Sequence, residues 1–181
     1  RKHNLKVVED AAHAIGAEYK GTRIGTIGDT TCFSFYATKN MTTAEGGAVT
    51  LNDEEMAAKL RILSLHGMSK DAWKRYTSAG SWYYEVVVPG FKYNMMDIQA
   101  ALGIHQLARV EASLLRRQEV WRRYDEALAD LPVFQPAPEE TGTRHARHLY
   151  TLLVDIDNAG ITRDEVLSSL HRQNIGTGVH Y

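Results

Sequence analysis

Three short apolar runs in the first 51 residues constrain the fold more than any other feature of this sequence. They are Leu5 to Glu9, Thr31 to Tyr36 and Ala48 to Leu51, and loops with polar residues and glycines separate them. Runs of this length and composition are typical of strands in a sheet that helices cover on both faces. The sequence therefore predicts an α/β fold with a mostly parallel sheet.

Local signals add a hairpin and helices to this sheet. Residues 17–24 predict a hairpin that turns at Lys20-Gly21. Asn52, with Glu55 three positions later, predicts a capping box for a helix that ends before Gly67. Apolar spacing from Met96 to Leu131 predicts one long bent helix or two in series.

A proline-rich stretch divides the chain. Three of the four prolines lie in the polar segment 132–147, which predicts a linker. Beyond it we expect a strand over 148–154, a helix from Ile161 with a capping box of Thr162 and Glu165, and a strand over 176–181. This order predicts a small α+β lobe.

The composition of the chain argues against several classes of binding partner. The formal net charge is -1, from 21 basic and 22 acidic residues, so no overall field favours nucleic acid or an anionic membrane. The single cysteine, Cys32, excludes an internal disulfide and a multi-cysteine metal site. His145 and His148 lie three positions apart, but no third ligand is evident and we expect no metal. No apolar run reaches the roughly 20 residues of a membrane span, so a cytoplasmic location is expected.

Two residues at strand ends suggest cofactor chemistry. Pyridoxal 5'-phosphate (PLP) requires a lysine amine, a carboxylate beside its pyridine nitrogen and donors for its phosphate. Asp10 follows the first strand, where open α/β sheets place ligand-binding groups, and Lys39 follows the second. The alternatives are that Asp10 only caps a turn and that Lys39 is a solvated surface charge.

Three ordered motifs carry a resemblance to a known family. They are EDAAHAIG at 9–16, CFSFYATKN with TTAEGG at 32–40 and 42–47, and GFKYNMMDIQAALG at 90–103. Together they resemble the DegT/DnrJ family of PLP-dependent aminotransferases, which act on nucleotide-linked keto sugars. The resemblance implies part of the fold-type-I large domain over 1–131, a linker over 132–147 and the start of the small domain over 148–181.

The resemblance also implies roles for the residues of the first two motifs. Lys39 is the Schiff-base lysine, which also moves a proton during catalysis, and Asp10 is the partner of the pyridine nitrogen. His13 contacts the phenolic oxygen or the ring, and Ser34 donates to the phosphate. The alternatives are a structural histidine and a strand hydroxyl bonded to backbone. Lysine at position 39 favours transamination, because the family's dehydratase branch has histidine there.

Further residues are assigned to the phosphate and the substrate. In this family a segment like 90–97 reaches the neighbour's cofactor across a dimer interface, so Asn94 or Lys92 is expected there. Relatives often carry asparagine at the position of Lys92, and the alternative for both is a plain polar loop. Lys74, Arg75, His180 and Tyr181 are expected to bind the sugar nucleotide. The aromatic residues around Lys74 and Arg75 have the alternative of packing an interface.

These inferences predict an aminotransferase that moves an amino group, with glutamate as donor, to a nucleotide-linked keto-deoxysugar. Family members are roughly twice as long, so the chain is expected to be a fragment that lacks an N-terminal part and a C-terminal end. Alone it is expected to be inactive. Two other classes stay open: a PLP-binding sensor without turnover, and a non-enzymatic interaction domain in which Lys39 is on the surface.

Overall fold

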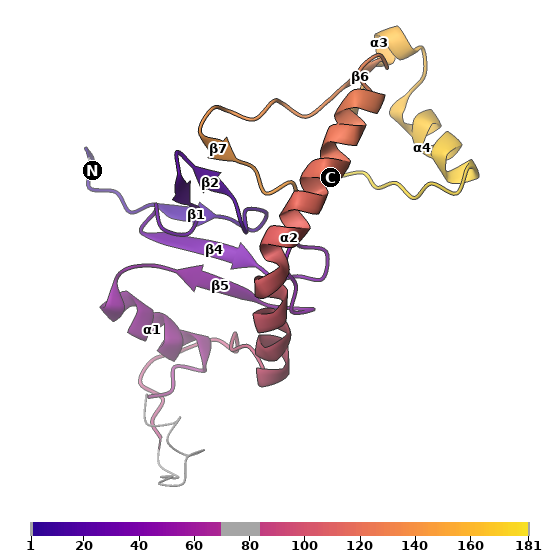
Figure 1. Cartoon of the computed structure of the whole chain (residues 1–181). Coiled ribbons are helices and arrows are strands. Elements are labelled where there is room, and N and C mark those ends of the chain that lie inside the picture. The colour runs from indigo at the N-terminus through magenta and orange to yellow at the C-terminus, as the bar shows by residue number, and fades with distance from the viewer. Residues whose placement is uncertain (1, 70–83, 181) are drawn as a thin grey trace.

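The computed structural model describes residues 2–69 and 84–180. Strands and helices follow one another along the chain, which confirms the predicted α/β class (Figure 1). Predicted substrate residues Lys74, Arg75 and Tyr181 lie outside the described residues.

The central sheet brings the ends of two predicted strands to one edge. It has the order β1 (Val8–Asp10), β4 (Thr30–Ser34), β5 (Gly47–Thr50). β1 and β4 are parallel, with Asp10 opposite Cys32, whereas β4 and β5 are antiparallel. The carboxyl ends of β1 and β4 therefore lie together, and the loop that holds Lys39 leaves from that edge. The expected cover on both faces is incomplete among the described residues, since Val8 is 70% and Val49 is 45% exposed.

A second sheet joins the predicted hairpin to the predicted linker. β2 (Glu18–Tyr19) and β3 (Thr22–Arg23) form the hairpin, and Lys20 and Gly21 turn it in left-handed conformations with φ of 49° and 75°. β7 (Thr143–Arg144) lies within segment 132–147 and pairs with β2. Part of segment 132–147 is thus a strand of this second sheet. The proposed domain boundaries stay a prediction.

Helix α1 (Glu54–Ser64) starts one residue later than predicted. Asp53, not Asn52, is its N-cap and accepts a hydrogen bond from the Met56 amide at 2.9 Å. The predicted box of Asn52 and Glu55 is wrong, because two adjacent capping residues compete here and the negative charge of Asp53 also suits a helix N-terminus. After the helix, Gly67 has φ of 73°, and a Cβ there would lie 1.7 Å from the Val88 carbonyl oxygen, so only glycine fits.

The helical spacing over 96–131 corresponds to one helix, α2 (Asp97–Ala127). It packs against the lysine loop: a Cβ on Gly103 would lie 3.1 Å from the Thr43 methyl, and Gln99 donates to the Glu45 carbonyl at 2.8 Å. Thr43 is 1% and Met41 is 5% exposed. Buried contacts with α2 therefore support the loop that carries Lys39.

The remaining elements form an arm beyond the far end of α2 (Figure 1). β6 (Val133–Phe134) pairs with β8 (Leu153–Val154), and α3 (Ile156–Ala159) and α4 (Arg163–Arg172) follow. The predicted capping box of Thr162 and Glu165 is confirmed. The strand predicted over 148–154 shrinks to β8, and residues 176–180 form no strand, because an extended segment needs a hydrogen-bonded neighbour to become one. Among the described residues, no helix is long and apolar enough to cross a bilayer.

Candidate functional site

Asp10 and Ser34 end the two parallel strands and line one hollow of about 430 Å³. The Asp10 Oδ1 atom accepts from the Ala12 amide at 3.0 Å, so the turn-capping role holds as well. The Ser34 hydroxyl likewise accepts, at 3.4 Å, from the Tyr36 amide. Each side chain keeps further hydrogen-bonding capacity toward a ligand in this hollow.

Lys39 projects from the loop after β4 toward the loop after β1. Its amide donates to the Tyr36 carbonyl at 2.9 Å, which turns the chain sharply. Its Nζ atom lies 2.6 Å from Nε2 of His13. With Lys39 as the donor, His13 accepts through the lone pair on Nε2. Two of the predicted site residues are therefore in direct contact.

The electrostatics of His13 link this pair to Asp10. Desolvation of the ring lowers the pKa of His13 below its usual value, and the charges of Lys39 and His180 lower it further. The Asp10 carboxylate acts in the opposite direction and raises that pKa. His13 thus interacts electrostatically with both Asp10 and Lys39. Its pKa is lowered on balance, which favours the neutral imidazole.

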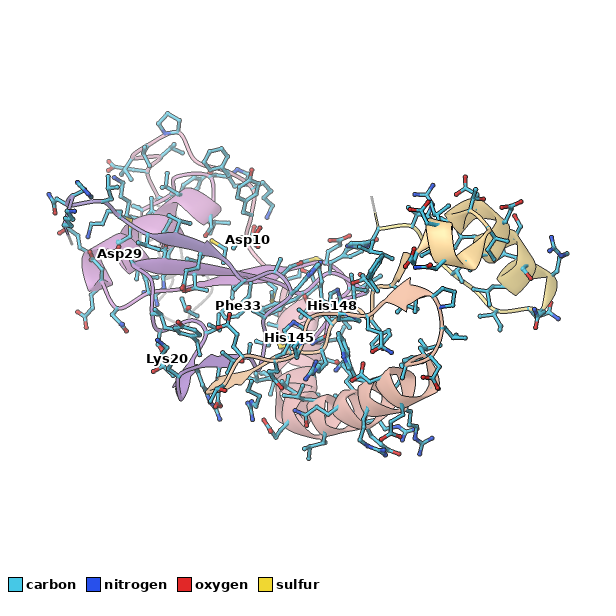
Figure 2. All side chains as sticks on the ribbon, turned by 90° about the horizontal axis from the view of Figure 1, so that it is seen from above. Asp10, Lys20, Asp29, Phe33, His145 and His148 are labelled. Atoms are coloured by element: carbon cyan, nitrogen blue, oxygen red, sulfur yellow. The ribbon has the colours of Figure 1, made fainter. Side chains whose placement is uncertain are left out.

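Two more histidines approach His13. The ring centroids of His13 and His148 are 4.2 Å apart, and His180 lies 6.3 Å from His13. Figure 2 shows Asp10 and His148 at the same end of the strands. Burial lowers the pKa of His148 to about 4, with further lowering by the charges of neighbouring His13 and Lys39. The structure therefore places the predicted residue His180 near the site and adds His148, which the sequence did not indicate as part of it.

Lys92 and Asn94 contact each other. The Lys92 Nζ atom donates to the Asn94 side-chain oxygen, and Lys92 forms a backbone bridge with Leu65 at the end of α1. Among the described residues, no hydrogen bond or ion pair joins Lys92 or Asn94 to His13 or Lys39. Their predicted role in cofactor binding, which concerns a second copy of the chain, stays a prediction.

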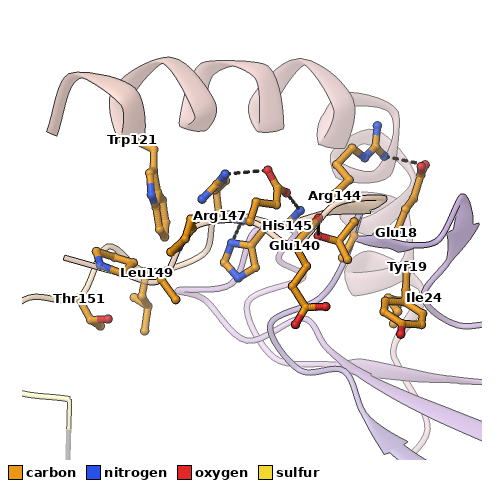
Figure 3. A pocket seen from close by; sticks show the side chains of 16 residues that line it. Glu18, Tyr19, Ile24, Trp121, Glu140, Arg144, His145, Arg147, Leu149 and Thr151 are labelled. Carbon is orange, nitrogen blue, oxygen red and sulfur yellow. Dashed lines mark hydrogen bonds and ion pairs between the residues drawn. The ribbon is translucent and has the colours of Figure 1, made fainter. Parts of the chain in front are cut away.

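A larger hollow of about 600 Å³ lies on the other side of segment 145–151 (Figure 3). Trp121 forms one wall, with the Arg147 guanidinium 4.7 Å from its ring centroid. Arg147 also pairs with Glu139 at 2.9 Å. His145 lines this hollow, whereas His148 faces Asn40, so these two histidines do not share a ligand site. Neither Asp10 nor Lys39 lines this hollow.

Lys39 and His13 do not line the smaller hollow, but their loops leave the same sheet edge at which Asp10 and Ser34 lie. The set of side chains at this edge fits PLP. A loop lysine supplies the amine, a strand-end carboxylate can pair with a protonated ring nitrogen, and a hydroxyl can donate to a phosphate. Asp10, Ser34 and Lys39 supply these groups at one edge of an α/β sheet. This combination of fold and side chains is typical of the class of PLP-dependent α/β enzymes.

Comparison with known proteins narrows this class. The model of the DegT/DnrJ/EryC1/StrS aminotransferase family matches residues 1–181, and the chain belongs to that family. The spore coat polysaccharide biosynthesis protein SpsC of Bacillus subtilis is 55% identical over 183 residues, and an uncharacterized protein of Methanocaldococcus jannaschii, MJ1066, is 56% identical over 181. Both matches cover 100% of this chain and 47% of the relative, so the chain spans about half the length of these relatives.

Solved structures agree with this assignment. The PLP form of a sugar aminotransferase, Spr1654 of Streptococcus pneumoniae, has a TM-score of 0.83 and 38% identity. That match covers 97% of this chain and 44% of Spr1654. The same protein was also solved in its PMP form, which has a TM-score of 0.84. Aminotransferases of this family are PLP-dependent, which is the cofactor expected from the sequence.

Proposed function

We propose that the protein uses PLP to transfer an amino group from glutamate to the keto carbon of a nucleotide-linked deoxysugar. The observation that carries the proposal is the contact of Lys39 Nζ with His13 Nε2 at 2.6 Å, beside the strand end that presents Asp10. Membership of an aminotransferase family supports the reaction type. SpsC, a polysaccharide biosynthesis protein, and Spr1654, a sugar aminotransferase, support a sugar substrate.

Four residues of this chain would hold the cofactor. Lys39 would bind it covalently through Nζ, and Asp10 would pair with its ring nitrogen. Ser34 would donate to the phosphate, and His13 would contact the ring or its phenolic oxygen. When bound, PLP supplies an electron sink for the bond that breaks next to the reacting amine.

The chain's own groups account for the proton chemistry. Lys39 Nζ is the base that accepts a proton at the substrate carbon and returns it. A neutral His13 accepts a hydrogen bond from that amine and so orients it. The Asp10 carboxylate would keep the ring nitrogen of the cofactor protonated, because a nearby negative charge stabilises the cationic form of that nitrogen.

The remaining site residues fall into two groups. Asn94 or Lys92 would reach the cofactor phosphate of the other subunit in a homodimer. His180, near His13, would contact the sugar nucleotide together with Lys74, Arg75 and Tyr181. Mixing Lys39→Ala subunits with Asn94→Ala,Lys92→Ala subunits tests the dimer: a shared site restores part of the activity, and a site within one subunit restores none.

We also propose that residues 1–181 expressed alone do not turn over. The hollow that holds Asp10 and Ser34 is open, and Val8 on its wall is 70% exposed. A cofactor there would lack much of the enclosure that excludes water.

The direct test is the first half of the reaction. The complete protein, loaded with PLP and mixed with glutamate, should form pyridoxamine phosphate and one equivalent of 2-oxoglutarate. Adding a nucleotide-linked keto sugar should regenerate PLP and yield the amino sugar. PLP binding without conversion by any amino acid would instead indicate a sensor, and no PLP binding would indicate an interaction domain.

A further inference from the structure

We propose that Asn40 and His148 are positioning residues for Lys39, which join its loop to a segment 106 to 108 positions further along the chain. The proposal rests on the proposed function, because it concerns the same lysine. Asn40 follows Lys39 directly, so any restraint on its side chain also restrains the backbone from which the amine projects.

Two hydrogen bonds fix the Asn40 amide. Its Nδ2 atom donates to the Ala146 carbonyl at 2.7 Å, and its Oδ1 atom lies 2.9 Å from His148 Nδ1. A backbone carbonyl can only accept, so the Asn40 oxygen must face the histidine. His148 then donates from Nδ1, and as a neutral imidazole it carries its lone pair on Nε2. This assignment follows from the network of donors and acceptors.

The partner segment is itself anchored on α2. Tyr150 donates to the Asp125 carboxylate at 2.8 Å, and its ring packs 4.8 Å from that of Trp121. Odd-numbered residues 145–151 line the larger hollow, while Ala146 and His148 contact Asn40. Ala146 is 2% exposed, so its carbonyl offers a well-defined acceptor. The lysine loop is thus tied through this segment to the longest helix.

His148 also reaches Lys39 by a second route. Its ring lies 4.2 Å from that of His13, which contacts Lys39 Nζ. The titratable groups that face His148 are His13, Lys39, Arg117 and His180, from four different parts of the chain. All of them are cations or can become cations, so a neutral imidazole suits this place best. The lowered pKa of His148 agrees with that state.

The test compares two replacements of His148 in the complete, PLP-loaded protein. His148→Asn keeps an N–H donor near the position of Nδ1, whereas His148→Phe keeps only a ring. We expect His148→Phe to lower kcat about tenfold or more, with little change in KM for glutamate. It should also shift the pH midpoint of the absorbance of the lysine-bound cofactor. His148→Asn should restore most of both properties.

Tyr150→Phe is the matched control, because it removes one hydrogen bond of the same segment but keeps the ring that packs on Trp121 and leaves the Asn40–His148 pair intact. It should change neither readout. If His148→Phe does not fold, Asn40→Asp is the second variant, since it keeps the size of the side chain and places an acceptor against the Ala146 carbonyl.

Three results would overturn the proposal: normal kcat and midpoint in His148→Phe, equal loss in His148→Asn, or the same shift in Tyr150→Phe. If His148→Phe does not fold, normal kcat and midpoint in Asn40→Asp would overturn it equally. A wild-type protein that converts no glutamate would instead refute the proposed function.

Discussion

The Lys39 amine and the His13 imidazole, 26 positions apart in the sequence, meet at 2.6 Å between Nζ and Nε2. The contact exists because β1 and β4 run parallel and end at the same edge of the sheet. Loops that follow neighbouring parallel strands necessarily start side by side, and this places acid, imidazole and amine together. The response of the site to mutation and to pH depends on this arrangement and on its support by α2.

Asp10→Asn should separate the charge of Asp10 from its structural role. Asparagine keeps the Oδ1 acceptor for the Ala12 amide, which Asp10 contacts at 3.0 Å, so the turn should persist. A nearby carboxylate raises the pKa of a cationic group by about 1–3 units, so its loss should lower the pKa of the ring nitrogen of PLP by a similar amount. We expect amino transfer to slow about tenfold to a thousandfold, measured as single-turnover conversion with glutamate. Unchanged rates in a folded Asp10→Asn protein would remove Asp10 from the cofactor site.

Acid should destabilise the protein through His148. The pKa of its imidazole has the ordinary value of 6.5 in the unfolded chain, but burial lowers it to about 4 in the fold. Between these values the unfolded chain binds a proton that the folded chain does not. The contribution of His148 to stability is therefore full above pH 6.5 and is lost as the pH falls toward about 4. The lowered pKa of His13 acts in the same direction.

Thermal unfolding of the PLP-free complete protein across this pH range checks the effect. The melting temperature should fall with pH, and it should fall less steeply in His148→Asn, which has no imidazole to titrate at that position. Parallel curves for the two proteins would contradict the assignment.

Trp121→Ala should destabilise the packing of segment 145–151 on α2. Trp121 is 7% exposed and touches the Arg147 guanidinium and the Tyr150 ring. Removing a buried tryptophan side chain costs about 3–5 kcal/mol, measured by denaturant unfolding of the complete protein. Trp121→Phe, which keeps an aromatic ring for both contacts, should lose much less. Equal losses in the two variants would show that ring packing is not the cause.

Local patterns explain which parts of the fold the sequence predicted. The apolar runs located β1, β4 and β5, and Lys20-Gly21 located the hairpin turn, because these signals lie within a few residues of the structure they specify. The capping box of Thr162 and Glu165 worked for the same reason. The α1 N-cap was wrong by one residue, since Asn52 and Asp53 are both good caps and only the three-dimensional path of the chain decides between them.

Distant contacts explain what the sequence could not predict. His148 meets Asn40 over 108 positions, and no spacing rule connects two such residues. The pairing of β7 with β2 is more distant still, so the proline-rich stretch predicted to be a linker contributes a strand. Residues 176–180 show the converse: an extended pattern does not become a strand without a partner. The resemblance, rather than periodicity, supplied the roles expected of His13 and Ser34.

The decisive measurement is the identity of the lysine that holds PLP. The PLP-loaded complete protein is reduced with sodium borohydride, digested and examined by mass spectrometry. We expect a pyridoxyl group on the peptide that contains Lys39, and no such group anywhere in the Lys39→Ala protein. A pyridoxyl group on another lysine of the wild-type protein, or a borohydride-reducible adduct that survives Lys39→Ala, would contradict it.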